Sequence, residues 1–220
     1  MDGIDIRIAE KPSDLSWESL HEFLWTAHAG NRAQGIHMRF PSLSGAEIRD
    51  RVLENGKMFV AFCGTELVGM AAVILKQRKT WWGRRRLCAH LCFDAVHSDY
   101  RRHGVLDALV SAREQYAHAQ GARLFYLDTH ERNESRIRAG VKEGYKAVGY
   151  CFFKDHFSVV MAKWPEGCPF SEEYILFRFC LSRVKSFFQA LFTRDAAIRQ
   201  TLMKTFFLYR NQRKSQLTAK

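Results

Sequence analysis

The residues whose types and spacing point most directly to chemistry form one short stretch: Arg101, Arg102, His103, Gly104, Val105 and Leu106. The apolar run Ala89–Val96 before them favours a β-strand, and an apolar stripe at helical spacing follows them: Val105, Leu109, Ala112 and Tyr116. We therefore expect a basic turn between a strand and a helix N-terminus. Unpaired N–H groups and the positive end of the helix dipole make such a terminus a phosphate site. Gly104 lacks a Cβ, so a pyrophosphate could approach its backbone closely.

Composition indicates a soluble globular chain. It has 220 residues, of which 47% are hydrophobic and 26% are charged, enough for one domain with an appendage. No apolar run approaches the roughly 18–20 residues of a membrane span, and Asp2 and Asp5 do not suit a signal peptide. The six cysteines form no C-x-x-C pair, which favours buried thiols over a metal site or a structural disulfide. We therefore expect a cytoplasmic protein without a metal.

The formal net charge of +11 favours polyanions, anionic lipid headgroups or a phosphorylated cofactor as partners. Two segments concentrate the charge, Lys76–Arg86 and residues 163–220. The first contains Trp81 and Trp82, a composition also found in platforms for single-stranded nucleic acid. We favour a solvated hairpin loop there over a contact to an acidic substrate, and either of these over nucleic-acid binding.

The periodicity predicts a mixed α/β fold. Expected helices begin near Ser13, at Ser44 with a capping box to Glu47, at Gly104 and at Asn133, whereas Gly30–Pro41 is expected to be a loop. Strands are expected at residues 4–9, 58–63, 67–75, 88–96, 124–128, 145–153 and 157–162. The order β–α–α–β–β–β–α–β–α–β–β indicates one sheet with helices on its faces. We expect a domain over residues 1–164 and an extension over residues 165–220.

Several features in order give residues 4–164 a family resemblance. They are the strand ending Phe93-Asp94-Ala95-Val96, the loop Arg101-Arg102-His103-Gly104, Asn133 opening a helix, Glu143-Gly144-Tyr145 closing it, and the final strand Ser158–Lys163. With the element order, they make the chain resemble the GNAT (Gcn5-related N-acetyltransferase) superfamily. The family's loop reads Gln/Arg-x-x-Gly-x-Gly/Ala, which Arg101 and Gly104 fit, whereas Leu106 stands where a small residue is usual. The resemblance implies a mostly antiparallel central sheet flanked by helices.

The resemblance also implies the reaction, which is acyl transfer from acetyl-CoA to an amine. In such proteins the loop carries the CoA pyrophosphate, so Arg101 to Leu106, with His103 and Val105 among them, would be cofactor-binding. The strand before the loop pairs with the pantetheine arm, which implies Ala95 and Val96. Asn133 would contact the cofactor arm from the next helix. No metal is implied. The acceptor class that we expect is a small-molecule amine or an amino sugar.

The chemistry requires a base, because a protonated amine is not a nucleophile. Alignment with histone-acetylating members of the family places His90 at their catalytic glutamate, and imidazole can accept a proton near neutral pH. Asp94 is a second candidate, and regular alternation places it on the same strand face as His90, four residues on. The alternative is a strand histidine without a catalytic role. The tyrosine that commonly serves as acid is replaced by Gly140, so Tyr145, water or unaided departure of the thiolate remain open.

Residues 171–214 predict a basic amphipathic helical segment, with Leu176, Cys180, Val184, Phe187 and Leu191 at helical spacing. We favour a helical hairpin packed on the domain or across a homodimer, and a peripheral contact with an anionic membrane is the alternative. For the whole chain, the rival to an enzyme is a non-catalytic GNAT-like module that binds CoA or an anion and docks through this segment.

Overall fold

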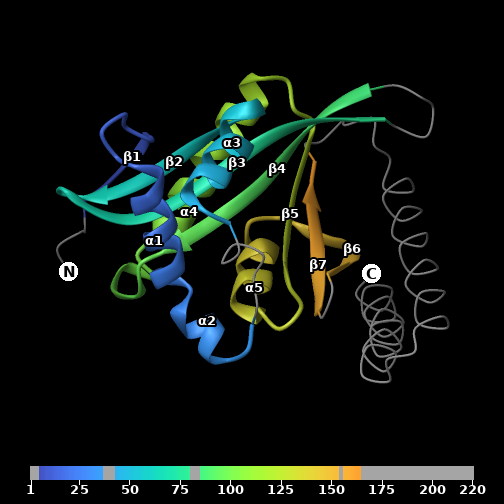
Figure 1. Cartoon of the computed structure of the whole chain (residues 1–220). Coiled ribbons are helices and arrows are strands. Elements are labelled where there is room, and N and C mark those ends of the chain that lie inside the picture. The colour runs from blue at the N-terminus through green and yellow to red at the C-terminus, as the bar shows by residue number, and fades with distance from the viewer. Residues whose placement is uncertain (1–4, 37–42, 80–84, 154–155, 165–220) are drawn as a thin grey trace.

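A seven-stranded sheet forms the centre of the molecule, with the strand order β1-β2-β3-β4-β5-β7-β6 (Figure 1). The computed structural model describes residues 5–36, 43–79, 85–153 and 156–164. Its strands are β1 Ile6–Glu10, β2 Gly56–Cys63, β3 Glu66–Lys79, β4 Arg85–Val96, β5 Leu124–His130, β6 Lys146–Phe153 and β7 His156–Lys163. Strands β4 and β5 are parallel, and the other neighbouring pairs are antiparallel. The predicted mixed, mostly antiparallel sheet is confirmed.

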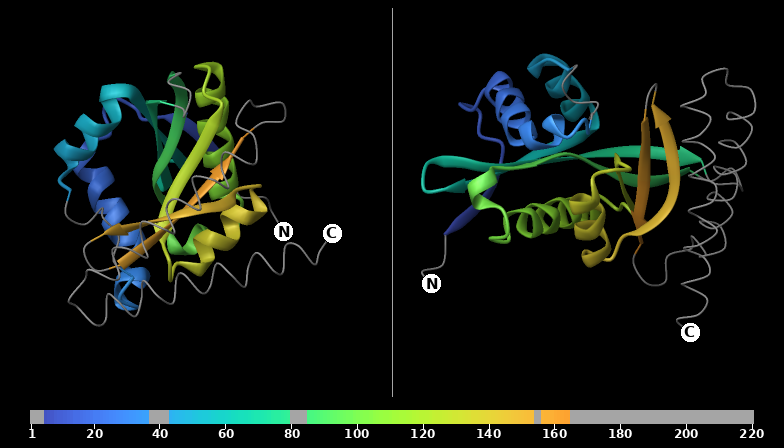
Figure 2. Two further views of the ribbon diagram at one scale, coloured as in Figure 1. Left: turned by 90° about the vertical axis from the view of Figure 1, so that its right-hand side faces the viewer. Right: turned by 90° about the horizontal axis from the view of Figure 1, so that it is seen from below.

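Helices cover both faces of this sheet. They are α1 Trp17–Ala27, α2 Ala29–Ala33, α3 Gly45–Asn55, α4 Val105–Ala119 and α5 Glu134–Lys142. Figure 2 shows α1, α2 and α3 on one face and α4 and α5 on the other. The capping box is confirmed, since the Ser44 side chain accepts from the Glu47 N–H and the Glu47 carboxylate accepts from the Ser44 N–H.

Two predicted helix boundaries need correction. Helix α1 begins after Ser16, whose hydroxyl accepts from the Ser19 N–H at 3.0 Å, and not near Ser13. Helix α2 overlaps the segment predicted as a loop, Gly30–Pro41, and begins one residue before it. A single helical turn without an apolar stripe leaves no periodicity to detect, which is why the pattern missed it.

The predicted basic loop Lys76–Arg86 is wrong at both ends. Strand β3 continues to Lys79 and β4 begins at Arg85, with these two residues paired at the tip of the described ladder. Backbone pairing does not require apolar side chains, so charge alone misplaced the boundary. Trp81 and Trp82 lie outside the described residues.

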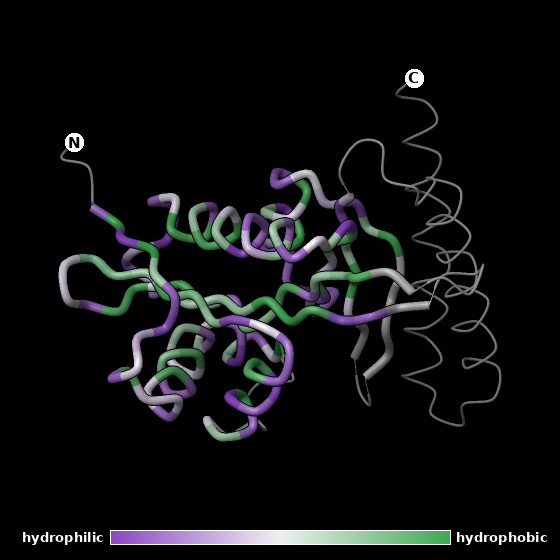
Figure 3. Tube along the Cα trace, turned by 90° about the horizontal axis from the view of Figure 1, so that it is seen from above, coloured by the Kyte–Doolittle hydropathy of each residue, from purple (hydrophilic) through white to green (hydrophobic). Residues whose placement is uncertain are grey.

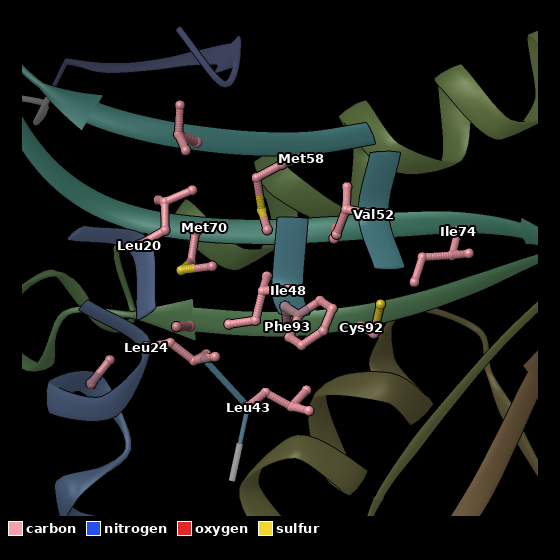
Figure 4. Packing of buried hydrophobic residues seen from close by; sticks show 14 residues of the cluster. Leu20, Leu24, Leu43, Ile48, Val52, Met58, Met70, Ile74, Cys92 and Phe93 are labelled. Carbon is pink, nitrogen blue, oxygen red and sulfur yellow. The ribbon is translucent and has the colours of Figure 1, made fainter. Parts of the chain in front are cut away.

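The core packs on both sides of the sheet. Between α1, α3 and strands β2 to β4 lies a cluster that includes Leu20, Leu24, Ile48, Val52 and Met58 (Figure 4). Each such side chain contributes about 1.5–3 kcal/mol through its removal from water. On the other face Val105 and Leu109 of α4 pack against β2 and β3. Figure 3 shows the same distribution as hydrophobic segments along the central strands.

A β-bulge interrupts β4. Ala72 pairs with Cys92 and Met70 pairs with Ala95, so Phe93 and Asp94 together oppose the single residue Ala71. Phe93 adopts φ +57°, a left-handed conformation that is costly for a residue with a side chain. Cys92, Phe93 and Ala95 all join the cluster on the α1/α3 side.

The bulge overturns one prediction. His90 pairs with Ile74, which belongs to the α1/α3 cluster, so His90 is on that side of the sheet. Asp94 instead contacts arginines of α4 and α5 on the opposite side. The expectation that His90 and Asp94 share a face is therefore wrong, because an extra residue between them reverses the alternation.

Several expectations fall outside the described part of the chain. They include the helical extension at 165–220 and its dimer or membrane contacts, which stay predictions. Within the described residues, no helix is long and apolar enough to cross a membrane. Among the described cysteines, Cys63 and Cys92 are free thiols.

Candidate active site

The site lies where the two parallel strands part. Residues 88–91 of β4 pair with residues 124–127 of β5, and beyond this point the strands diverge (Figure 1). The bulge begins two residues further along β4, which bends that strand away. A cavity of about 540 Å³ opens into the gap. Its walls come from β4, the ends of α1 and β5, the N-terminus of α4, and α5.

Nearly all the residues predicted to bind the cofactor line this one cavity. They are Ala95, Val96, Arg101, Arg102, Gly104, Val105, Leu106 and Asn133. His103 lies in the same turn but is absent from the lining. The cavity therefore brings together residues that the sequence distributes over a strand, a turn and two helices.

Two residues of the turn before α4 have a left-handed backbone conformation. Gly104 is the N-cap of α4 with φ +79°, and Arg102 has φ +69°. A Cβ at Gly104 would meet no atom within 4 Å, so it is the backbone angle, not crowding, that favours glycine. Because no side chain caps α4 from this position, its first-turn N–H groups suit a bound anion.

Arg101 makes a connection that the loop pattern does not predict. Its Nη2 atom donates to the carbonyl oxygen of Ala27 at 2.7 Å, and its Nε atom donates to the carbonyl oxygen of Val96 at 3.4 Å. The guanidinium thus joins the loop to the end of α1.

Asn133 is 4% exposed and its side chain is largely occupied. Its Oδ1 atom accepts from the Ser135 hydroxyl at 2.9 Å and from the Arg136 N–H at 3.3 Å, which caps α5. Its Nδ2 atom donates to Thr129 Oγ1 at 3.1 Å. The predicted cap is confirmed, and one amide hydrogen is left for a ligand in the cavity.

His90 forms a pair with a carboxylate that the sequence analysis did not identify. Its Nε2 atom lies 2.8 Å from Oδ1 of Asp128, and its ring stacks on Tyr126 with centroids 4.7 Å apart. Asp128 lines the cavity, whereas His90 does not. A carboxylate only accepts hydrogen bonds, so Nε2 carries the proton. Within the described residues, Nδ1 is buried without a partner. Asp128, at the end of the strand expected at 124–128, was the available clue.

Asp94 is engaged on both oxygens. Oδ1 accepts from Arg113 Nη1, and Oδ2 accepts from Arg136 Nε at 3.1 Å. Burial alone would raise the pKa of Asp94, but the two guanidinium groups outweigh it and hold that pKa below its ordinary value. The geometry therefore favours a permanently ionised, structural carboxylate over a base. Arg113 follows Val105 and Leu109 at four-residue spacing, a position that indicates an inward-facing arginine.

Two further side chains complete the surroundings of Asp94. Arg136 also donates to Glu143 at 3.2 Å, and burial raises the pKa of Glu143. From the other face, His28 Nε2 donates to the Asp94 carbonyl oxygen at 2.9 Å, while its Nδ1 accepts from Asn31 at 3.1 Å. Burial lowers the pKa of His28, so the neutral ring fits this arrangement.

Gly140 has a packing reason to be glycine. A Cβ there would lie 3.0 Å from both Sδ and Cε of Met161 and 3.7 Å from Nη1 of Arg136. The hydroxyl groups of two other tyrosines that could act as the acid already donate hydrogen bonds to glutamates. The Tyr145 hydroxyl donates to Glu114 at 2.6 Å and does not line the cavity. Tyr100 does line it, but its hydroxyl donates to Glu66, which raises the pKa of Tyr100 to about 12.

Comparisons with known proteins agree with this geometry. The model of the Acetyltransferase (GNAT) family matches residues 17–155. Three similar solved structures are a GNAT-family acetyltransferase from Streptococcus pneumoniae, Ard1 from Thermoplasma volcanium, and the PaiA N-acetyltransferase from Thermoplasma acidophilum in complex with coenzyme A. Their TM-scores are 0.54, 0.53 and 0.53, and their identities to this chain are 17%, 18% and 17%. The matches cover 73%, 72% and 73% of this chain and 100%, 97% and 99% of those chains. No curated protein matches the sequence.

Proposed function

Because the chain belongs to the GNAT acetyltransferase family, we propose that it transfers an acetyl group from acetyl-CoA to a primary amine. The acceptor in this proposal is a small molecule or an amino sugar, and transfer is direct, within a ternary complex. The observation that carries the proposal is the single cavity between β4 and β5, which gathers a strand edge, a phosphate-type turn and the start of α5.

In this proposal acetyl-CoA lies along the cavity, from the turn before α4 to the bulge in β4. The pyrophosphate would lie on the N–H groups of Arg102 to Leu106, where the α4 dipole adds a favourable field. The pantetheine arm would run along Ala95 and Val96. In the described residues β5 pairs with β4 no further than Leu91, so this edge of β4 is open to an extended ligand. The thioester would then lie beside the bulge.

His90, acting together with Asp128, is our proposed base. The amine nitrogen attacks the thioester carbonyl carbon, the new C–N bond forms, the C–S bond breaks, and the ammonium proton passes to this pair, whose carboxylate lines the cavity. Asp128 would orient the imidazole through Nε2 and stabilise the positive charge on the pair. A carboxylate at the cavity wall also attracts a cationic amine.

No side chain is assigned as the acid. Every tyrosine considered above is occupied elsewhere or replaced, and a thiol with a reference pKa near 8.5 leaves readily as the thiolate. We therefore propose that the CoA thiolate departs unaided and takes its proton from water.

The test uses the full-length protein with acetyl-CoA and a panel of amines that includes amino sugars, polyamines and amino acids. Release of free CoA thiol is measured alongside CoA affinity by calorimetry. The proposal predicts amine-dependent release that saturates in both substrates, with intersecting initial-rate lines. CoA binding without turnover on any amine would instead support the rival, a non-catalytic module that binds CoA.

A further inference from the structure

The bulge in β4 requires support from outside the sheet. Phe93 holds a left-handed backbone angle, φ +57°, and two residues of β4 oppose one of β3. Such conformations persist only where the surroundings fix them, and a bulge disrupts the regular ladder around it. Buried carbonyl groups at this point need donors from elsewhere.

Arg113 of α4 supplies those donors. Its side chain is fully buried, and its Nη1 atom donates to the carbonyl oxygens of Ala72 at 3.1 Å and Cys92 at 3.4 Å. These two residues face each other across β3 and β4 immediately before the bulge. A single guanidinium therefore bridges both strands at the point where their ladder becomes irregular.

A buried guanidinium needs a counter-charge, and the bulge itself provides it. Asp94, the second bulge residue, accepts from Arg113 with one oxygen and from Arg136 of α5 with the other. Arg136 in turn pairs with Glu143 at 3.2 Å. Two cations and two carboxylates thus join β4, α4 and α5.

The same residue is held from the opposite face. His28, at the end of α1, donates from Nε2 to the carbonyl oxygen of Asp94 at 2.9 Å. Asp94 is therefore fixed through its carboxylate on one side of the sheet and through its backbone on the other. Both anchors act on the segment that borders the cavity.

We propose that Arg113 is a positioning residue, which together with Asp94 and Arg136 holds the β4 bulge in the geometry that acyl transfer requires. This inference rests on the proposed function, because it places the thioester beside the bulge. Arg113 itself does not line the cavity, and it donates hydrogen bonds to two residues that do, Asp94 and Cys92. Its effect should accordingly appear in the acyl-transfer step and not in the affinity for CoA.

The test compares Arg113→Met with Glu114→Gln, its neighbour on α4. Glu114 also accepts buried hydrogen bonds, from Tyr145 and Lys163, but makes no contact with the bulge. We expect Arg113→Met to lower kcat about 10- to 100-fold, since small displacements of a reacting group have effects of this size. KM for acetyl-CoA should stay within about threefold of the wild-type value. Glu114→Gln should lower the midpoint of urea unfolding but leave kcat unchanged.

Amide hydrogen exchange measures the effect of the substitution on the bulge itself and does not depend on turnover. In Arg113→Met, residues 92–96 should exchange faster while β2 and the rest of β4 keep wild-type protection. Arg113→Lys retains the charge but lacks the planar fork, so its kcat should be intermediate. If Arg113→Met does not fold, Arg113→Lys is compared with Glu114→Gln in its place.

Two results would overturn the inference: an unchanged kcat with unchanged exchange at 92–96, or equal losses of kcat in Arg113→Met and Glu114→Gln. If the wild-type protein acetylates no amine, the proposed function fails and the exchange measurement alone decides. Faster exchange confined to 92–96 would then still establish Arg113 as the support of the bulge, and unchanged exchange would exclude it.

Discussion

His90 and Asp128 form a hydrogen-bonded pair, with Nε2 and Oδ1 2.8 Å apart, at the point where β4 and β5 separate. The strands pair no further than Leu91 and Leu127, and Asp128 lines the cavity that opens beyond this point. A base at this place acts on the proton of the attacking amine. The arrangement gives the most direct prediction for the chemistry.

We expect His90→Ala to lower kcat by about 100-fold, the lower end of the usual effect of a general base, with little change in KM for acetyl-CoA. Asp128→Asn should also lower kcat, because an amide can donate to Nε2 and so favour the wrong tautomer. Initial rates across pH 6–9 measure both effects. Tyr126→Phe is the control, since it keeps the ring stacked on His90 and should retain activity. Wild-type turnover in His90→Ala across that range would exclude His90 as the base.

The sequence predicted the fold and most of the cavity because the signals involved are local. Hydrophobic alternation, the Ser44–Glu47 capping box and the Arg101–Gly104 turn depend on neighbouring residues alone. The bulge at Phe93 and Asp94 is different, because it depends on how β4 pairs with β3 and on a buried arginine 19 residues further along. Alternation counted through the bulge therefore placed Asp94 on the wrong face.

Asp128 and His28 were missed for a related reason. Asp128 lies 38 residues from its partner His90, and His28 lies 66 residues from Asp94. Neither contact can be predicted from the sequence until the parallel pairing of β4 and β5 and the packing of α1 are known. In contrast, Arg113 continues the inward positions of Val105 and Leu109, so a stricter reading of the helical stripe could have found it.

The phosphate site can be tested with a matched pair of glycines at the two ends of α4. Gly104 and Gly121 have φ +79° and +85°, and a Cβ at either would meet no atom within 4 Å. Glutamate at either position therefore imposes a similar backbone cost, about 1–2 kcal/mol. Only Gly104 lines the cavity. We expect Gly104→Glu to weaken acetyl-CoA binding at least about tenfold through charge repulsion, and Gly121→Glu to bind normally in calorimetry.

Equal affinities for acetyl-CoA in the two variants would contradict the assignment of the Arg101–Leu106 turn to pyrophosphate. Urea unfolding of both proteins serves as the control, because the two midpoints should fall by similar amounts. A loss of affinity in Gly104→Glu then cannot be attributed to loss of structure.

Gly140 gives a prediction about packing and the absent acid. Gly140→Tyr should destabilise the protein by about 1–3 kcal/mol, because the side chain enters space that Met161 and Arg136 already occupy. Gly140→Ala should be close to neutral, since the gain in helix propensity of about 1 kcal/mol offsets the contact with the flexible end of Met161. Met161→Ala combined with Gly140→Tyr should recover part of the loss in urea unfolding. If Gly140→Tyr alone were as stable as the wild type, close packing would not explain the absence of a tyrosine at this position.

The contributions of the buried carboxyl groups of Asp94 and Glu143 to the free energy of unfolding should change with pH in opposite directions. The pKa of Asp94 is lowered in the folded protein, so the unfolded chain takes up this proton first as the pH falls. Its contribution to stability is therefore complete above about pH 4, near the ordinary value for aspartate, and is lost as the pH falls through the folded-state pKa. The pKa of Glu143 is raised, so its contribution is complete below about pH 4 and is lost as the pH rises through the folded-state pKa.

These signs predict how two variants differ from the wild type in urea unfolding at several pH values. At pH 7 Asp94→Asn should lose about 3–5 kcal/mol, the usual effect of removing one partner of a buried ion pair. This deficit should shrink below about pH 4, where the unfolded wild-type chain takes up the Asp94 proton before the folded protein does. For Glu143→Gln, the free energy of unfolding relative to the wild type should instead rise with pH above about 4, because the variant has no buried carboxylate to ionise. A deficit in Asp94→Asn that stayed constant down to pH 3 would show that the Arg113–Asp94–Arg136 interaction does not depend on the Asp94 charge.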